Sequence, residues 1–260
     1  MTTKIAAGAI ALIGLATTTF AQIASDTAGN YGGTWTNGSN GGFGFTPWDL
    51  SQNNNNGTDT FAGYFLGDST AGTGNINDAS GNSFGMFANP LGAFANASRA
   101  FTEGALQPGQ TFSLQMAVNF RNGNKGVLVN SGSSQLFDFN VGNNDYTYSV
   151  SGGGQTSLGL SYQADSVFSI SFTQTDGTTI QVAITRMSAG GGTETALNQS
   201  FNVGAAINNF KFYISGTDNG AAANNLYFNN LQVVPEPSTL ALVAAPAIFG
   251  ALAFVRRRRA

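Results

Sequence analysis

Two residue types with reactive side chains are missing from this chain of 260 residues, which contains no cysteine and no histidine. Without cysteine there is no disulfide framework, no thiol nucleophile and no thiolate metal site. Without histidine there is no Ser-His-Asp triad, no Cys-His pair and no imidazole-bound zinc. Stability must therefore come from the packed core, and the chemistry left open is that of carboxylates or calcium.

Charged residues are also scarce, at 9% of the chain. The body of the chain, residues 22–234, contains twelve acidic residues from Asp26 to Asp218 and five basic ones: Arg99, Arg121, Lys125, Arg186 and Lys211. Nucleic-acid binding needs a basic surface, so we expect none here. Sparse charge with abundant Gly, Asn, Ser and Thr is typical of extracellular β-proteins.

The first twenty-one residues have the three parts of a secretory signal peptide. Lys4 supplies a positive charge, an apolar stretch follows from Ile5 to Ala16, and Thr19-Phe20-Ala21 places small residues where signal peptidase reads. We predict cleavage after Ala21 and export of the body. A first transmembrane anchor is the alternative, although the apolar stretch is short for a membrane span.

The last residues, 234–260, also have three parts. Pro235-Glu236-Pro237 is followed by an uncharged apolar run from about Leu240 to Val255 and by a basic block made of Arg256, Arg257, Arg258 and Arg259. At about 1.5 Å per residue, the run barely crosses a hydrocarbon core of roughly 30 Å. The four arginines should stop transfer and stay in the cytoplasm, which predicts a transmembrane helix with the body outside the inner membrane.

This C-terminal pattern resembles the PEP-CTERM sorting signal of exopolysaccharide-producing Gram-negative bacteria. The resemblance implies recognition by the membrane enzyme exosortase, a cut near Pro235, Glu236 and Pro237, and transfer to the cell surface or extracellular matrix. A plain C-terminal anchor, or a buried helix with a basic tail, is the alternative. The resemblance covers residues 234–260 and carries no information on what the body does.

The body is predicted to be built from short strands. Phe112, Leu114, Met116, Val118 and Phe120 share one face of a period-two pattern, which indicates a half-buried strand. Similar patterns predict strands over residues 61–66, 83–87, 99–103, 136–141, 146–150, 158–162, 167–173, 179–187, 199–203, 207–214 and 226–233. Residues 126–129 are expected to pair back on 111–120 as a hairpin.

Two local signals refine this prediction. Asp176-Gly177 predicts a hairpin turn between neighbouring strands, and a β-bulge near Asn229-Asn230 would reconcile the two phases of the last strand. We therefore predict an all-β antiparallel sandwich, arranged as a jelly roll, over residues 22–233. From about residue 111 to 233 the pattern resembles the concanavalin-type lectin and glucanase sandwich, a fold that hosts lectins, hydrolases and inert modules alike.

Catalytic residues are not evident in this body. Sandwich glycosidases of the laminarinase kind carry paired glutamates about 5 Å apart, whereas the body has only Glu103 and Glu194, without partners at that spacing. Asp138 alternates with the inward Phe137 and Phe139, so we expect it to face solvent. The protein is predicted not to be an enzyme.

Sugar binding is the stronger class of site. Trp35, Trp48, Tyr31 and Tyr64 stand among Asn and Asp residues, and a sugar site combines aromatic planes with amide groups. The alternative is that both tryptophans pack in the core or at a sheet edge.

Calcium is a weaker possibility, and no cofactor is predicted. Loop oxygens are offered by two sets of residues, and neither has the spacing of an EF-hand loop. The sets are Asp218, Asn219 and Gly220, and Asp68, Asn75, Asn77 and Asp78. Solvated turns are the alternative interpretation of both.

Two hypotheses for the function follow. The first is an exported structural protein of the cell surface or exopolysaccharide matrix, processed by signal peptidase and an exosortase. The second is a carbohydrate-binding module for an extracellular polysaccharide.

Overall fold

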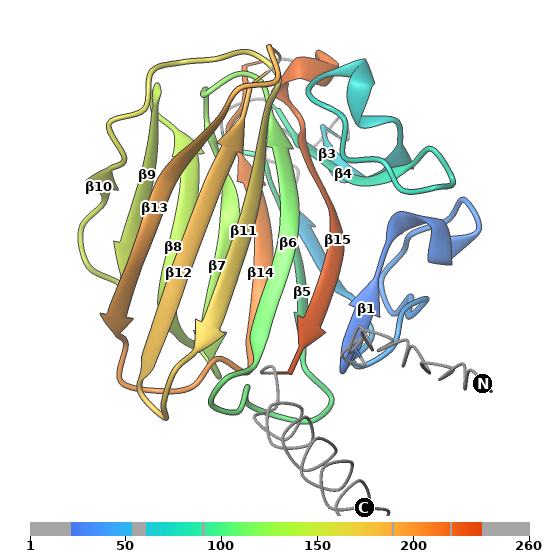
Figure 1. Cartoon of the computed structure of the whole chain (residues 1–260). Helices are drawn as coiled ribbons and strands as arrows, with labels where there is room; N and C mark the ends of the chain where they lie inside the picture. Colours follow the sequence, from blue (N-terminus) through green and yellow to red (C-terminus); the bar gives the residue numbers. More distant parts are fainter. Residues whose placement is uncertain (1–21, 54–60, 90–91, 189, 219, 236–260) are drawn as a thin grey trace, which may run out of the picture. The chain divides into compact units, whose positions relative to one another are not determined.

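The described chain forms two antiparallel β-sheets that face each other (Figure 1). The structure is a computed structural model, and it describes residues 22–53, 61–89, 92–188, 190–218 and 220–235. These residues belong to one compact unit. In the part of the chain that is described, no helix is both long and apolar enough to span a bilayer.

Most of the predictions for the two ends of the chain lie outside the described residues. Of the predicted sorting motif, only Pro235 is described, as the last residue after the final strand. The parts of these predictions that lie outside the described residues are the predicted signal peptide 1–21, Glu236, Pro237, the apolar run 240–255, and Arg256, Arg257, Arg258 and Arg259. The transmembrane helix and the stop-transfer role of the four arginines therefore stay predictions.

The first layer, here called the β6 sheet, has the strand order β13-β12-β11-β6-β15-β4-β3, and β1 also pairs with β15. Its strands in chain order are β1 (Ala24–Asp26), β3 (Ala62–Gly67), β4 (Ser83–Ala88), β6 (Thr111–Val118), β11 (Ser166–Gln174), β12 (Thr179–Met187), β13 (Thr193–Asn202) and β15 (Leu226–Val234).

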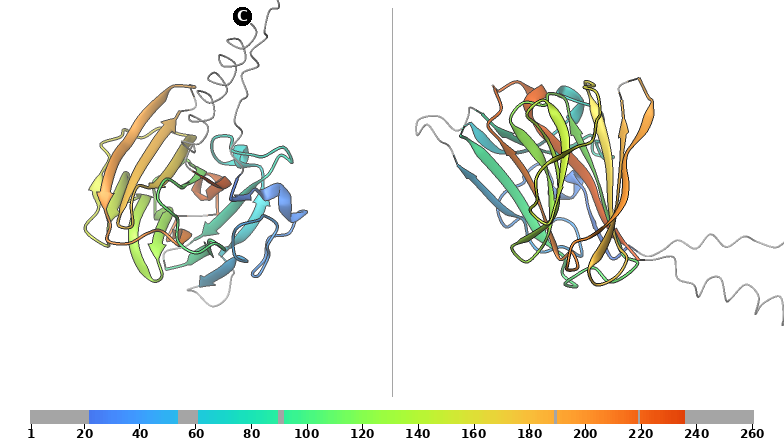
Figure 2. Two further views of the ribbon diagram at one scale, coloured as in Figure 1. Left: turned by 60° about the horizontal axis from the view of Figure 1, so that its bottom comes forward. Right: turned by 90° about the vertical axis from the view of Figure 1, so that its left-hand side faces the viewer.

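The second layer, here called the β8 sheet, has the order β10-β9-β8-β7-β14-β5-β2. Its strands are β2 (Asp49–Asn53), β5 (Phe94–Ala100), β7 (Asn124–Ser131), β8 (Ser134–Gly142), β9 (Asp145–Val150), β10 (Thr156–Ser157) and β14 (Asn209–Ser215). Short 3-10 turns η1 (Ala28–Tyr31), η2 (Ser69–Ala71) and η3 (Ala222–Asn224) complete the described elements. Seen edge-on in Figure 2, the two sheets are separate layers.

Alternating side chains fill the space between the sheets, as the sequence predicts. In β6, Phe112, Leu114 and Met116 are buried, while Ser113 and Gln115 are partly exposed on the other face. Aromatic rings join the layers: Phe212 of β14 stacks on Phe228 of β15 with centroids 3.7 Å apart. Such ring pairs contribute about 0.5–1.5 kcal/mol each beyond the burial of their apolar area. The predicted all-β sandwich is confirmed.

Four local predictions are wrong. Residues 126–129 do not pair with 111–120, because β11 and β15 occupy both edges of β6 and β7 joins the β8 sheet instead. Phe120, predicted to face inward, lies beyond the end of β6 at Val118 and is 44% exposed. The strand expected at 99–103 lies upstream as β5, and only Thr156–Ser157 forms a strand near the one expected at 158–162.

The predicted bulge is present in β15. The register against β6 shifts between Asn229 and Gln232, and Asn230 has a positive φ of 56°. The shift lets both halves of β15 point their apolar residues inward and leaves Asn229 buried. Its amide donates to the carbonyls of Ile76 and Asn82, which ties a loop to this point of the sheet. The Asp176-Gly177 turn likewise joins β11 to β12 as predicted.

Lys125, in β7, is fully buried between the sheets. Its Nζ donates to the Phe120 carbonyl at 2.5 Å and to Asn122 Oδ1 at 3.1 Å. Burial lowers the pKa of Lys125 to about 7, and the charge of Asp218 opposes this shift. The side chain therefore ties the segment between β6 and β7 to the interior while its charged form is disfavoured there.

This burial predicts a pH dependence of stability. In the unfolded chain Lys125 keeps its proton up to about pH 10.5, while in the folded protein it loses the proton near pH 7. The free energy of unfolding should therefore rise with pH between these values, by at most about 1.4 kcal/mol per pH unit. Urea unfolding at pH 7, 8 and 9 measures the slope, and Lys125→Met is the control that should lack it. Equal slopes in both proteins would contradict the burial of this ammonium group.

Candidate functional site

A hollow of about 610 Å³ lies on the outward face of the β8 sheet. We call it the β8 groove. Its lining comes from β5, β14, β7, β8 and β9, together with Asn143 and Gln155. These strands are neighbours in the sheet, so the groove crosses them rather than following one of them.

Residues that are register partners on neighbouring strands form rows that run across the sheet, and the polar residues of the groove lie in such rows. In the central row Asn96, Tyr213, Gly126, Asn140 and Thr147 are successive partners across five strands. Gly126 leaves room for the Tyr213 side chain in the middle of this row: a Cβ there would lie 2.0 Å from the Phe139 carbonyl oxygen and 2.7 Å from the Tyr213 hydroxyl. The missing side chain lets Tyr213 reach across β7 toward β8.

Tyr213 meets Asp138 and Asn140 on β8. Its hydroxyl lies 2.7 Å from Asp138 Oδ1, to which it donates, and 3.1 Å from Asn140 Oδ1. Gln155 donates to Asp138 Oδ2 at 3.0 Å. The predicted solvent-facing Asp138 is therefore on the expected face but only 6% exposed, because the tyrosine and the glutamine cover it.

The electrostatics of the groove follow from this burial. Desolvation raises the pKa of the Asp138 carboxyl, and the hydrogen bonds from Tyr213 and Gln155 and the charge of Lys211 oppose the shift. Burial next to Asp138 raises the pKa of the Tyr213 hydroxyl well above its usual value, so this group remains a neutral donor. The groove thus presents amides, a tyrosine and a covered carboxyl.

The two groove carboxyls are poorly placed for glycoside hydrolysis. Asp145 pairs with Gly142, four residues along β8 from Asp138. At about 3.4 Å per residue, four residues correspond to roughly 13 Å along the strand. Paired catalytic carboxyls lie about 5–9.5 Å apart. The arrangement is suited to binding polar hydroxyl groups rather than to acid–nucleophile chemistry.

The tryptophans proposed as sugar platforms lie inside the sandwich. Trp35 is 5% exposed and Trp48 is 1% exposed, and their rings meet edge to face with centroids 5.3 Å apart. Both also contact Phe84 and Phe228. Both tryptophans therefore pack in the core, which is the alternative prediction, and neither has a ring face accessible to a sugar.

The two candidate tyrosines are also engaged within the fold. The Tyr31 hydroxyl donates to Asp26 Oδ2 at 2.5 Å and accepts from Trp48 Nε1 at 2.8 Å. Tyr64 is partly buried, and its hydroxyl lies 2.5 Å from the Ser51 carbonyl and 3.0 Å from that of Asn96. Burial raises the pKa of Tyr64 to about 12. The structure brings the four candidates into one cluster through the Trp35–Trp48 and Trp35–Tyr64 ring contacts and the Trp48–Tyr31 hydrogen bond, but their rings and hydroxyls are used within the fold.

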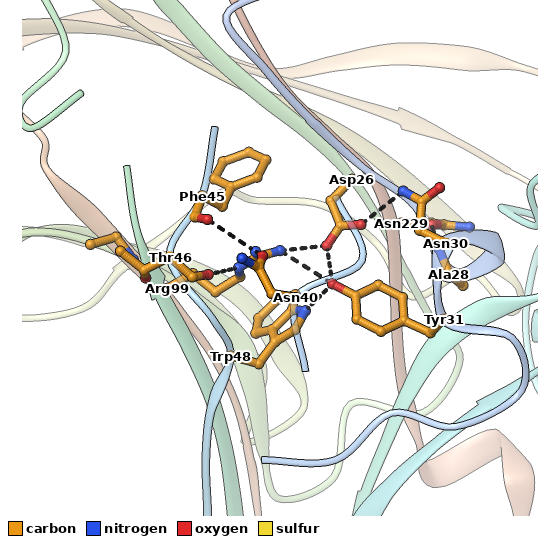
Figure 3. A network of polar contacts seen from close by, with 11 residues as sticks. Asp26, Ala28, Asn30, Tyr31, Asn40, Phe45, Thr46, Trp48, Arg99 and Asn229 are labelled. Carbon is orange, nitrogen blue, oxygen red and sulfur yellow. Dashed lines mark hydrogen bonds and ion pairs between the residues drawn. The ribbon is translucent and has the colours of Figure 1, made fainter. Parts of the chain in front are cut away.

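Tyr31 and Trp48 belong to a buried polar network around Arg99 (Figure 3). Arg99 Nη1 lies 2.5 Å from Asp26 Oδ2, and both side chains are fully buried. The guanidinium also donates to Asn40 Oδ1 and to the Thr46 and Phe45 carbonyls, and it packs about 5 Å from the rings of Phe45 and Trp48. Burial raises the pKa of Asp26 and lowers that of Arg99, and their pairing opposes both shifts.

The carboxylates suggested as calcium ligands in the first half of the body already accept hydrogen bonds from neighbouring loop residues. Asp68 Oδ1 accepts from the Thr70 amide and hydroxyl and from Asn77, while Asp78 accepts from Ser80 and from the Gly29 amide. Over residues 22–235, excluding the undescribed gaps, no cluster of three acidic side chains could hold a metal. Asn219, in the other suggested set, lies outside the described residues.

No family model matches the chain, and no curated protein matches it. Among solved structures it is similar to the binding domain of botulinum neurotoxin serotype D, with 13% identity and a TM-score of 0.38 over 72% of this chain and 47% of that one. It is also similar to the galectin LEC-6 of Caenorhabditis elegans, with 11% identity and a TM-score of 0.32 over 56% and 94%. The match spans about half of the toxin domain's length, and likeness at this level supports no functional assignment.

The Arg99 network predicts a large effect of removing one partner. Arg99→Met leaves the Asp26 carboxylate buried without its cation, which should lower the free energy of unfolding by about 3–5 kcal/mol. The double variant Asp26→Asn/Arg99→Met should recover part of this loss, because it removes both charges. Urea unfolding at pH 7 measures both effects, with Lys211→Met as a cation removed from the sheet surface. A loss for Arg99→Met no larger than that of Lys211→Met would contradict the network's role.

Proposed function

We propose that the body binds a saccharide in the β8 groove. The observation that carries this proposal is the central row of Asn96, Tyr213, Asn140 and Thr147, in which the Tyr213 side chain lies over Gly126. Amides and hydroxyls can donate to and accept from sugar hydroxyls. The Tyr213 ring and the neighbouring Leu128 provide apolar surface for the C–H groups of a sugar.

We propose further that the protein is exported and acts without catalysis. The absence of histidine and cysteine removes most hydrolase mechanisms, and the spacing of Asp138 and Asp145 along the sheet supports binding over hydrolysis. Its role is then to hold or anchor polysaccharide, which unites the structural and the carbohydrate-binding hypotheses.

We propose the route of export and processing from the sequences of the two ends of the chain. The pattern of residues 1–21 supports cleavage by signal peptidase, and the PEP-CTERM-like residues 234–260 support transient anchoring in the inner membrane and processing by an exosortase. The body would then reach the cell surface or the exopolysaccharide matrix, where the β8 groove meets its ligand.

The groove proposal predicts the effect of two substitutions. Asn96→Ala removes an amide at one end of the central row and should weaken saccharide binding about fivefold, the equivalent of one hydrogen bond of about 1 kcal/mol. Tyr213→Ala removes the ring and should weaken binding by more than tenfold. Calorimetric titration of residues 22–235 with soluble polysaccharides measures both. Ser169→Ala, on the outward face of the β6 sheet, is the control that should bind normally; equal loss in the control, or none in Asn96→Ala, would contradict this site.

The proposed itinerary predicts the mass of the mature protein. Protein recovered from the cell surface or medium should lack residues 1–21 and should end near Pro235, which an intact-mass measurement reads directly. Replacing Pro235 and Pro237 by Ala should leave the C-terminal residues attached. Recovery of wild-type protein with the basic block, residues 256–259, still present would support plain anchoring and contradict sorting.

A further inference from the structure

The charges that line the β8 groove are two carboxyls and one ammonium. Asp138 lies under Tyr213 and Gln155, Asp145 lies on β9 opposite Gly142, and Lys211 lies on β14. Lys211 and Asp138 occupy one row of the sheet, separated by Leu128 of β7, and the charge of Lys211 acts on Asp138. Asp145 lies four rows away from Asp138 and forms no ion pair within the described residues.

The rest of the body supplies little positive charge to help an anion bind. Arg99 is paired with Asp26, Arg186 is paired with Glu194, and Lys125 is buried between the sheets. Arg121 packs against the rings of Tyr146 and Tyr162, and Tyr146 is fully buried on the inner face. Among the described residues, Lys211 is thus the one cation that lines the groove, in a body with five basic and twelve acidic residues.

Uncharged groups make up the remainder of the groove. The central row contains the amides of Asn96 and Asn140 and the hydroxyl of Thr147, which can donate and accept, and Tyr213, whose proton is donated to Asp138 and whose oxygen can still accept. A carboxylate or sulfate ligand would need several N–H donors or cations converging on one point. Among the described lining residues Lys211 is the one cation, and it shares its row with the Asp138 carboxyl.

The length of the groove indicates a chain rather than a single sugar ring. Its central row runs across five neighbouring strands, and strands about 4.8 Å apart make this row roughly 19 Å long. A ligand that contacted both Asn96 and Thr147 would have to extend over this distance. The Tyr213 side chain lies over Gly126 in the middle of this row, so a ligand that spans the row must pass across the tyrosine.

From this charge distribution and length we infer that the ligand is an internal stretch of an uncharged polysaccharide, and that the β8 groove discriminates against polyuronates and sulfated polymers. This inference rests on the proposed saccharide-binding function and adds the class of polymer. The discrimination comes from Asp145 and from the acidic body, which repel a polyanion, while the binding comes from the neutral amides and Tyr213.

The test compares neutral polysaccharides, such as glucans, galactans and mannans, with a polyuronate of similar length. Residues 22–235 are titrated with each by calorimetry at low and at moderate salt. We expect the best neutral polymer to bind at least tenfold more tightly than the polyuronate, with an affinity that changes less than twofold with salt. A short oligosaccharide should bind more tightly than its monosaccharide, because it reaches more of the central row.

A matched pair of charge variants separates the groove from the overall charge of the body. Asp145→Asn should strengthen polyuronate binding about threefold, the effect of one screened surface charge, and leave the neutral polymer within twofold. Asp176→Asn, in the exposed turn between β11 and β12, makes the same change of net charge away from the groove and should alter neither. Polyuronate binding as tight as or tighter than that of the neutral polymer would overturn the inference while leaving the proposed function intact. Failure of all polymers to bind would overturn both.

Discussion

The packing of aromatic rings between the two sheets is the interaction on which the rest of the structure depends. The chain has no disulfide to hold its layers together, so their contact must supply the stability. Phe112, Phe210, Phe212 and Phe228 form the centre of this contact, with stacked pairs across the layers. Because these rings take inward positions of the central strands, polar side chains are left for the outward faces, and the β8 groove is assembled from them.

The N-terminal segment depends on the same core through a different kind of contact. Trp35 and Trp48 fill the end of the aromatic layer, and the Arg99 guanidinium lies against Trp48 while holding Asp26 of β1. A buried ion pair contributes little net stability, but it requires one arrangement of its partners. The network therefore fixes how residues 24–48 lie against β5, whose outward residue Asn96 forms one end of the groove.

Much of the fold could be predicted because it depends on local alternation. The phases of β6, β11, β12 and β15 follow from period-two patterns, and even the bulge at Asn229-Asn230 is visible as a change of phase. Strand order is not local, which is why the predicted hairpin between 111–120 and 126–129 is wrong. The edges of β6 are paired with β11 and β15, and nothing in the sequence of residues 121–125 indicates this.

The site is harder to predict, because its contacts also depend on strand order. Alternation gives the face of Asp138, but its burial depends on Tyr213, which is 75 residues away and reaches it only because Gly126 stands on the strand between them. Trp35 and Trp48 are predicted to be accessible to a sugar, because their neighbours in the sequence are polar, but they are buried. Their contacts with Phe84 and Phe228, which are distant in the sequence, explain this burial.

The position of β15 has a consequence for how the molecule is made. This last described strand lies in the interior of its sheet, between β6 on one side and β4 and β1 on the other. Neither β1 nor β4 can pair with β15 until residues 226–234 have been synthesised. Until then, the strand edges that pair with β15 in the folded protein lack this partner. The β6 sheet therefore cannot be completed without the strand that immediately precedes Pro235.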